Sequence, residues 1–224
     1  MHIVDRRNLK KILKKFVPNT HRILDIGSGV GDNLQFMKSL GYTNVVGVDI
    51  SREMVDISNN LGHQAFLVED LDEDGFDVLL FSHVVEHVGY PEIKDFFEHY
   101  FRISNPSALV IVITPILYNG FFNDVDHIKP YYPDGLMTLF SKRSVSRQYS
   151  SEYQLYLEDI YYRRVAITPY NVRIRHAKNI AEKLMFRAFC LLGVIIRILS
   201  LGIIAKVTGY AAIFRLISTV DDGQ

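Results

Sequence analysis

Three glycines and two acids in the first quarter of the chain have the spacing of a ligand-binding turn. Gly27, Gly29 and Gly31 stand at alternate positions directly after an apolar run that contains Asp25. Glycines let the backbone approach a ligand closely, because no Cβ intervenes. Asp49 ends a second apolar run eighteen residues after Gly31, where a carboxylate can accept hydrogen bonds from both hydroxyls of a ribose. The pattern predicts a strand, a helix and a second strand around a nucleotide.

Two details bear on which nucleotide this turn binds. A dinucleotide fingerprint has a third glycine three residues after the second, and this chain has Asp32 there, followed by Asn33 and Leu34. Asp25 lies inside the first strand, two residues before Gly27. A carboxylate there would repel a pyrophosphate but suits a cationic ligand, which disfavours a nicotinamide-dependent oxidoreductase.

The stretch from 23 to 31 resembles motif I of class I S-adenosylmethionine-dependent methyltransferases. In that family the matching acid lies near the amino group of the ligand, and the glycines border its methionine part. The resemblance implies S-adenosyl-L-methionine as the cofactor. It assigns the methionine and ribose end to Asp25, Gly27, Ser28, Gly29 and Gly31, the ribose hydroxyls to Asp49 and the adenine face to Ile50.

A second set of residues resembles the same family, in the same order along the chain. Asp70 and Leu71 resemble its acidic and apolar pair after strand three, which implies that they border the adenine edge. The run 83–88 resembles the family signature after strand four, so Ser82 and His83 are expected to line the site. Glu86 and His87 belong to this signature, and the sequence leaves open whether they meet a ligand or serve capping and packing.

Alternation of apolar strands and amphipathic helices predicts an α/β fold. We expect a Rossmann-like three-layer sandwich with a seven-stranded, mostly parallel sheet, an antiparallel strand seven, and a helical insertion between strands six and seven. The 224 residues fit one methyltransferase domain. Its expected parts are an N-terminal helix (1–20), a cofactor-binding core (21–150, with strand six at 144–150), a basic and apolar insertion (151–208) and the last strand (209–218).

The segment 116–134 is rich in Asn, Asp, Pro and Tyr, which is typical of an active-site loop. His127 is its candidate catalytic residue, because an imidazole can take a proton from a substrate hydroxyl near neutral pH. The same histidine could instead tie the loop to the domain by hydrogen bonds, and both interpretations stay open. Cys and His show no metal-ligand spacing, so no metal is predicted.

Charge is balanced overall but unevenly distributed. Residues 1–140 hold 12 Lys or Arg against 19 Asp or Glu, and residues 141–224 hold 13 against 6. The N-terminus is basic and has no apolar signal core, so a cytoplasmic location is expected. Within the insertion, the 184–205 stretch is apolar apart from Arg187 and Arg197.

This apolar stretch is not expected to span a membrane, because Arg197 lies near its middle and the last strand must return to the sheet. It could pack on the sheet or on a second subunit in a homodimer. Alternatively, it lies in the membrane interface on the inner face. The cluster of seven Lys or Arg between 160 and 187 favours membrane contact or a substrate cover.

The resemblance and the insertion together indicate methyl transfer to a hydroxyl or carboxyl group. The acceptor is expected to be a small or membrane-presented molecule, such as a quinone precursor, a lipid or a lipid-linked glycan. A non-catalytic S-adenosylmethionine-binding module and a methyltransferase of a soluble metabolite are the alternatives. Nucleic acid is not expected as a partner, because no Asn/Asp-Pro-Pro-Tyr motif follows strand four.

Overall fold

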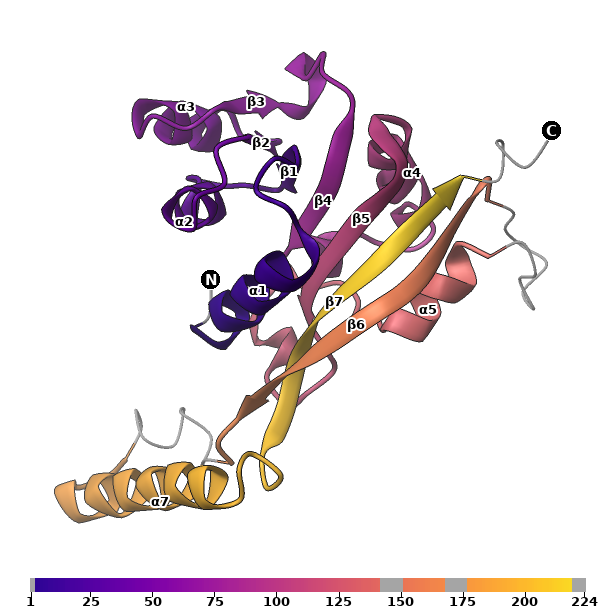
Figure 1. Ribbon diagram of the computed structural model, residues 1–224. Coiled ribbons are helices and arrows are strands. Elements are labelled where there is room, and N and C mark those ends of the chain that lie inside the picture. The colour runs from indigo at the N-terminus through magenta and orange to yellow at the C-terminus, as the bar shows by residue number, and fades with distance from the viewer. Residues whose placement is uncertain (1–2, 142–150, 168–176, 219–224) are drawn as a thin grey trace.

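A seven-stranded sheet organises the chain, with the strands in the spatial order β3-β2-β1-β4-β5-β7-β6 (Figure 1). The computed structural model describes residues 3–141, 151–167 and 177–218. β7 is antiparallel to β5 and β6, and the pairs among β1 to β5 are parallel, as the sequence predicts. The strands are β1 (Ile23–Ile26), β2 (Val45–Asp49), β3 (Ala65–Leu67), β4 (Phe76–Ser82), β5 (Ser104–Pro115), β6 (Tyr153–Val165) and β7 (Lys206–Ser218).

Helices cover both faces of this sheet, which makes three layers. Side chains of α1 and α2 pack on one face, and side chains of α4 and α5 pack on the other. α3 packs beside β3 through Val55. The described helices are α1 (Ile3–Phe16), α2 (Asp32–Ser39), α3 (Arg52–Asn60), α4 (Ile93–Arg102), α5 (Pro133–Leu139) and α7 (Ile180–Leu199), with single 3₁₀ turns η1 (Val68–Asp70), η2 (Val85–His87) and η3 (Phe121–Asn123).

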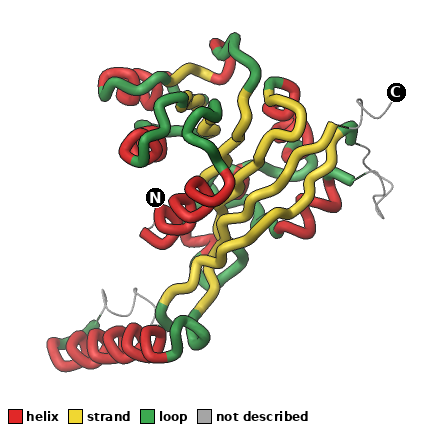
Figure 2. The backbone as a smooth tube through the Cα atoms, viewed as in Figure 1, coloured by secondary structure: helices red, strands yellow, loops and turns green. Residues whose placement is uncertain are grey.

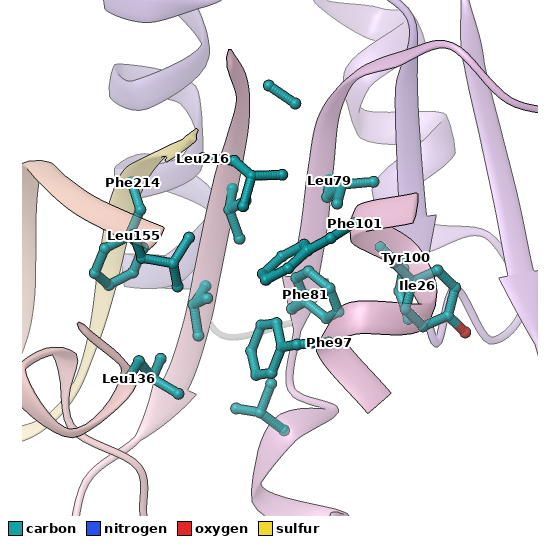
Figure 3. Packing of buried hydrophobic residues seen from close by; sticks show 14 of the residues in the cluster. Ile26, Leu79, Phe81, Phe97, Tyr100, Phe101, Leu136, Leu155, Phe214 and Leu216 are labelled. Atoms are coloured by element: carbon teal, nitrogen blue, oxygen red, sulfur yellow. The ribbon is translucent and has the colours of Figure 1, made fainter. Parts of the chain in front are cut away.

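The central strands are apolar throughout because both of their faces are covered. Phe81 of β4 meets Phe97 of α4 with ring centroids 4.5 Å apart, and Phe101 and Leu136 continue this cluster (Figure 3). Leu80, the neighbour of Phe81 on β4, belongs to the cluster on the opposite face. Alternating side chains thus fill two cores, and the strand ends between them are fixed.

The sixth strand lies outside the segment in which the sequence predicts it. The expected segment, 144–150, lies outside the described residues, and β6 occupies Tyr153–Val165, inside the range assigned to the insertion. β6 is an edge strand with a mostly exposed or half-exposed surface, so it lacks the apolar run that marks a buried strand. Its tyrosines favour extended structure, a signal that the interpretation as an insertion overlooked.

Smaller boundaries also differ from the expectation. β5 begins at Ser104, and its pairing with β4 shifts register between Phe76 and Val78. β7 begins at Lys206, three residues earlier than expected. These corrections shorten the segment between β6 and β7 to 166–205.

The hairpin of β6 and β7 extends past the rest of the sheet and carries α7 at its end (Figures 1 and 2). Pro115 at the end of β5 pairs with Gly209, whereas β7 starts at Lys206. The extension therefore leaves the sheet at the carboxyl ends of the parallel strands. None of the described helices has the length and apolar character needed to cross a membrane.

Candidate active site

The glycine turn is tied to β2 and leaves room above it. The amides of Gly27 and Ser28 both donate to the Val48 carbonyl oxygen at 2.9 Å. Gly29 has φ +53, and a Cβ built on it would meet no described atom within 4 Å. A side chain there would strain the turn and fill the open space, so glycine keeps the backbone accessible to a ligand.

Gly31 and the Ser28 side chain pack closely against neighbouring groups, and their contact with the cofactor stays a prediction. A Cβ on Gly31 would lie 2.6 Å from His63 Cδ2 and 2.7 Å from Ser58 Oγ. The Ser28 hydroxyl points down toward β2, since a Cβ on Gly47 would lie 2.6 Å from its Oγ. The backbone of Ser28, not its side chain, is therefore the part that borders the turn.

Asp25 is a buried acid beneath this turn. It is 0% exposed, its Oδ1 accepts a hydrogen bond from Asn33 Nδ2 at 3.2 Å, and its Oδ2 has no partner among the described residues. Burial raises the pKa of Asp25 to about 7 and the nearby Asp49 charge adds to it, while the Asn33 hydrogen bond opposes the shift. A cationic group at the turn would remove this cost, because it favours the ionised carboxylate.

The carboxylate of Asp49 closes the turn from the end of β2. Its Oδ2 accepts from the Gly29 amide at 2.8 Å, and its Oδ1 accepts from the Ser51 amide at 2.9 Å. These bonds fix the carboxylate and leave lone pairs for ribose hydroxyls. Ile50 follows with 89% of its surface exposed, as an apolar face ready for an aromatic ring.

Asp70 and Leu71, the pair after β3, also lie at the carboxyl end of the sheet. Asp70 is exposed and forms an ion pair with Arg52 at 3.1 Å, and Leu71 is half-buried against the core. Together with Asp49 and Ile50, these residues follow the carboxyl ends of β2 and β3. Their contact with adenine stays a prediction.

His83 stands at the end of β4 in a left-handed conformation, with φ 57, directly after the buried Ser82. Its Nε2 lies 3.2 Å from Asp5 Oδ2 of α1, and its Nδ1 lies 3.2 Å from Glu86 Oε1. Burial would lower the pKa of His83, but the hydrogen bonds and charges of Asp5 and Glu86 outweigh it and raise the pKa to about 9. The imidazolium thus binds α1 to the end of β4.

Arg163 of β6 completes this buried network. Its Nη1 donates to Asp5 Oδ2 at 2.6 Å, and its Nη2 donates to the Thr208 carbonyl oxygen at 2.8 Å. Burial would raise the pKa of Asp5, but His83 and Arg163 together lower it below its ordinary value. The sequence did not predict this contact between Asp5 and Arg163. Arg163 is one of many basic residues in its part of the sequence, and nothing in its local pattern sets it apart. The only local signal was an acid on the apolar side of an amphipathic helix.

The loop after β5 is held against η2. His127 Nδ1 lies 2.7 Å from the Phe121 carbonyl oxygen, and the ring of His127 packs on Phe121 with centroids 4.7 Å apart. His87 is the neighbour of His127, with ring centroids 5.1 Å apart. His127 therefore ties the loop together through Nδ1, and its Nε2 lies 3.7 Å from Asp124 Oδ2.

Comparison with known proteins agrees with this geometry. Residues 2–164 match the family described as a methyltransferase domain. The chain is also 30% identical over 123 residues to a threonine–tRNA ligase of Paraburkholderia phymatum. That match covers 48% of this chain and 18% of that protein, so the chain spans less than a fifth of that relative.

Solved structures share the fold over nearly the whole chain. A methyltransferase from Archaeoglobus fulgidus, described as SAM-dependent, has a TM-score of 0.55 and 18% identity, and the match covers 94% of each chain. An S-adenosylmethionine-dependent methyltransferase from Mesorhizobium loti has a TM-score of 0.52 and 14% identity, and the match covers 92% of this chain and 96% of that one. At these identities the likeness concerns the fold.

The residues of the turn fit S-adenosylmethionine. Asp25 Oδ2, which has no hydrogen-bond partner in the part of the chain that the structure describes, suits the ammonium group. The open backbone at Gly29 admits the ligand, and Asp49 suits the ribose. With the family match over 2–164 and the shared fold, this fit leads to one conclusion. The chain belongs to the methyltransferase-domain family and has the fold of S-adenosylmethionine-dependent methyltransferases.

Proposed function

We propose that this domain transfers a methyl group from S-adenosylmethionine to a hydroxyl or carboxyl oxygen of an acceptor at a membrane surface. A quinone precursor, a lipid and a lipid-linked glycan are acceptors of this class. The observation that carries the proposal is the exposed apolar face of α7. This helix lies beyond the carboxyl ends of the parallel strands, and the cofactor turn follows the carboxyl end of one of those strands, β1.

The protein's part in such a transfer is orientation and exclusion of water. When bound, S-adenosylmethionine supplies an electrophilic methyl group on a sulfonium. Asp49 and the Gly29 backbone would hold the nucleoside, and Asp25 would face the ammonium group. A hydroxyl acceptor must also lose a proton, whereas a carboxylate need not. Nε2 of His127 is the candidate proton acceptor in the loop after β5.

One side of α7 is less exposed than the rest of its surface, and its C-terminal end contacts β6 through Arg197. The less exposed positions are 182, 186, 190, 193, 197 and 200, which recur every three or four residues along one face. The opposite face is apolar and exposed, and it includes Leu184, Leu191, Leu192, Ile195 and Leu199. A contiguous exposed apolar face of this kind marks a surface that binds a partner or a membrane.

Basic residues surround α7, and hydrogen bonds attach its base to β6, and both features suit a membrane partner. The described residues from 164 to 206 include six Lys or Arg and one acid, Glu182. Arg197 Nη1 donates to the Arg164 carbonyl oxygen at 3.4 Å, and Arg164 Nη1 donates to the Gly202 carbonyl oxygen at 3.1 Å. These bonds fix the base of the helix on β6. Basic residues beside an apolar face attract anionic lipid, at about 1 kcal/mol each.

Vesicle flotation tests the membrane contact. The full chain is mixed with vesicles of phosphatidylcholine, with and without phosphatidylglycerol. We expect flotation with the anionic vesicles, and its loss in the double variant Leu191→Glu/Ile195→Glu. Leu61→Glu is the matched control, because Leu61 is also an exposed apolar residue but follows α3. Equal flotation of the double variant and the wild type would contradict the proposal, as would a dimer that dissociates in the double variant without any flotation.

Transfer of a labelled methyl group tests the acceptor. The full chain and labelled S-adenosylmethionine are incubated with membrane lipid extract and, separately, with aqueous metabolite extract. The proposal predicts labelled product in the lipid extract. Product confined to the aqueous extract would instead support a soluble metabolite as the acceptor.

A further inference from the structure

We infer that Glu86, His87 and His127 form a binding site for a divalent transition-metal cation at the acceptor end of the active site. One ligand atom from each of these three side chains lies within 4.8 Å of the others. Glu86 and His87 come from η2, and His127 comes from the loop after β5. The binding of the cation stands independently of the proposed function, but its role in catalysis rests on that function.

Hydrogen bonds fix the tautomers of both imidazoles. His87 Nδ1 lies 3.0 Å from the Asp126 carbonyl oxygen, and His127 Nδ1 lies 2.7 Å from the Phe121 carbonyl oxygen. A carbonyl oxygen only accepts, so each Nδ1 carries a hydrogen, and the neutral form of each imidazole keeps its lone pair on Nε2. Metal-ligating histidines show this arrangement, with the second ring nitrogen donating to a carbonyl or a carboxylate.

The backbone holds the two segments in register. The Glu86 carbonyl oxygen accepts from the Ile128 amide at 2.8 Å and from the Lys129 amide at 3.3 Å. Both imidazoles therefore sit on loops that are bonded to one another next to the cluster. Little rearrangement is needed before a cation binds.

The Glu86 carboxylate supplies a fixed negative charge. Its side chain is 0% exposed, with Oε1 3.2 Å from His83 Nδ1 and Oε2 3.0 Å from Thr114 Oγ1. Each carboxylate oxygen keeps a further lone pair in this arrangement. Asp124 Oδ2 adds a second carboxylate, 3.7 Å from His127 Nε2. The positive charge of His83 is divided between Glu86 and Asp5. Glu86 and Asp124 together therefore leave a net negative charge beside the two imidazoles.

A loop-tying role explains only part of this geometry. Tying the loop requires the two Nδ1 hydrogen bonds, but it does not require both imidazoles to meet beside a buried carboxylate. Two imidazoles and one carboxylate suit cations such as Zn²⁺, Co²⁺ or Mn²⁺ and leave coordination positions open. An acceptor hydroxyl at an open position would be oriented and would lose its proton more easily. His127 is then a metal ligand in place of a base.

Metal titration of the full chain tests this site without donor or acceptor. After treatment with EDTA and its removal, Co²⁺ binding is followed by visible absorption and Zn²⁺ binding by calorimetry. We expect one cation per chain. His87→Ala and His127→Ala should each weaken binding at least about 10-fold, since loss of an outer-shell partner alone costs about 10–100-fold. His99→Ala is the control, because His99 is exposed on α4, away from the cluster.

The outcomes separate this inference from the proposed function. Absence of wild-type binding up to about 1 mM of either cation would overturn the site. Binding by the His87→Ala/His127→Ala double variant as tight as that of the wild type would overturn it as well. Calorimetry with S-adenosylmethionine on the same samples reports the donor site separately. Intact donor binding without cation binding would therefore count against the metal alone.

Discussion

Two regions of the molecule differ in how they are stabilised: the β1–β2 region with the glycine turn (the cofactor end) and the β6–α7 region at the lateral edge of the sheet (the hairpin end). At the cofactor end, all four residues of β1 are buried, and the ligand-facing groups are fixed by backbone hydrogen bonds between neighbouring strands. At the other end, β6 is a half-exposed edge strand, and Gly193 is the buried residue of α7. The cofactor end is therefore stabilised by the core, whereas α7 adds surface that the core does not require.

This difference indicates a division of work. Folding and donor binding depend on the buried end, and acceptor delivery depends on the exposed one. Changes at one end should leave the other unaffected, apart from the buried network of Asp5, His83 and Arg163 that joins α1, β4 and β6.

Asp49→Ala should strongly weaken donor binding. The variant removes the expected acceptor of two ribose hydroxyls and the anchor of the Gly29 amide. Hydrogen bonds to a charged group contribute about 1.5–3 kcal/mol each, so we expect at least a 100-fold weaker Kd by calorimetry. Asp56→Ala, an exposed acid on α3, should bind as the wild type does. Undiminished binding by Asp49→Ala would contradict the assignment of this carboxylate.

Asp5→Ala should be the most destabilising change in the joining network. It leaves the buried Arg163 and the half-buried His83 without their shared carboxylate, and breaking a buried pair typically costs about 3–5 kcal/mol. Urea unfolding measures the loss, with Asp32→Ala on the surface of α2 as the control. A change no greater than that of the control would show that the network does not stabilise the fold.

Each variant should impair one activity and leave the other unchanged. Leu191→Glu/Ile195→Glu should weaken vesicle binding at least about 10-fold, because two apolar side chains of about 1.5–3 kcal/mol each no longer leave water. The same variant should bind S-adenosylmethionine as the wild type does. Asp49→Ala should keep its vesicle binding. Loss of both activities in either variant would contradict the division between the two ends.

Stability should fall as the pH rises from 6.5 to 9. The pKa of His83 is raised from 6.5 to about 9 in the folded chain. The stabilisation from its protonated form is therefore fully present below pH 6.5 and is lost as the pH rises through about 9. Urea unfolding across this range should show the decline, and His83→Gln should flatten it. An unchanged slope in His83→Gln would assign the decline to other groups.

Donor binding should release part of a proton near pH 6. With a pKa of about 7, Asp25 is largely protonated there, and a bound cation favours its ionised form. Calorimetry in buffers with different ionisation enthalpies measures the release, which should disappear at pH 8 and in Asp25→Asn. Equal release by Asp25→Asn would place the proton elsewhere.

The sequence predicted the cofactor end better than the other end for a physical reason. Asp25, Gly29 and Asp49 are close in sequence, and the strands that carry them are buried and apolar. β6 has no such run, because an edge strand buries few side chains, so it was interpreted as part of an insertion. Asp5 and Arg163 are 158 residues apart and meet only after β6 has joined the sheet. A local pattern does not contain such a contact.

The convergence of His87 with His127 illustrates the same limit. The two residues are 40 positions apart, and the spacing of histidines along the chain gave no metal signal. Their proximity depends on the pairing of the Glu86 carbonyl with the loop after β5. The segment 184–205, by contrast, was recognised as apolar, but its inner and outer faces became clear only from its position on the hairpin.

Calorimetric titration of the wild-type chain with S-adenosylmethionine and with NAD tests whether the glycine turn binds a sulfonium nucleoside. We expect one molecule of S-adenosylmethionine bound per chain and no measurable binding of NAD. Binding of NAD without binding of S-adenosylmethionine would contradict this expectation, because a turn flanked by Asp25 would then accept the pyrophosphate that it is expected to repel.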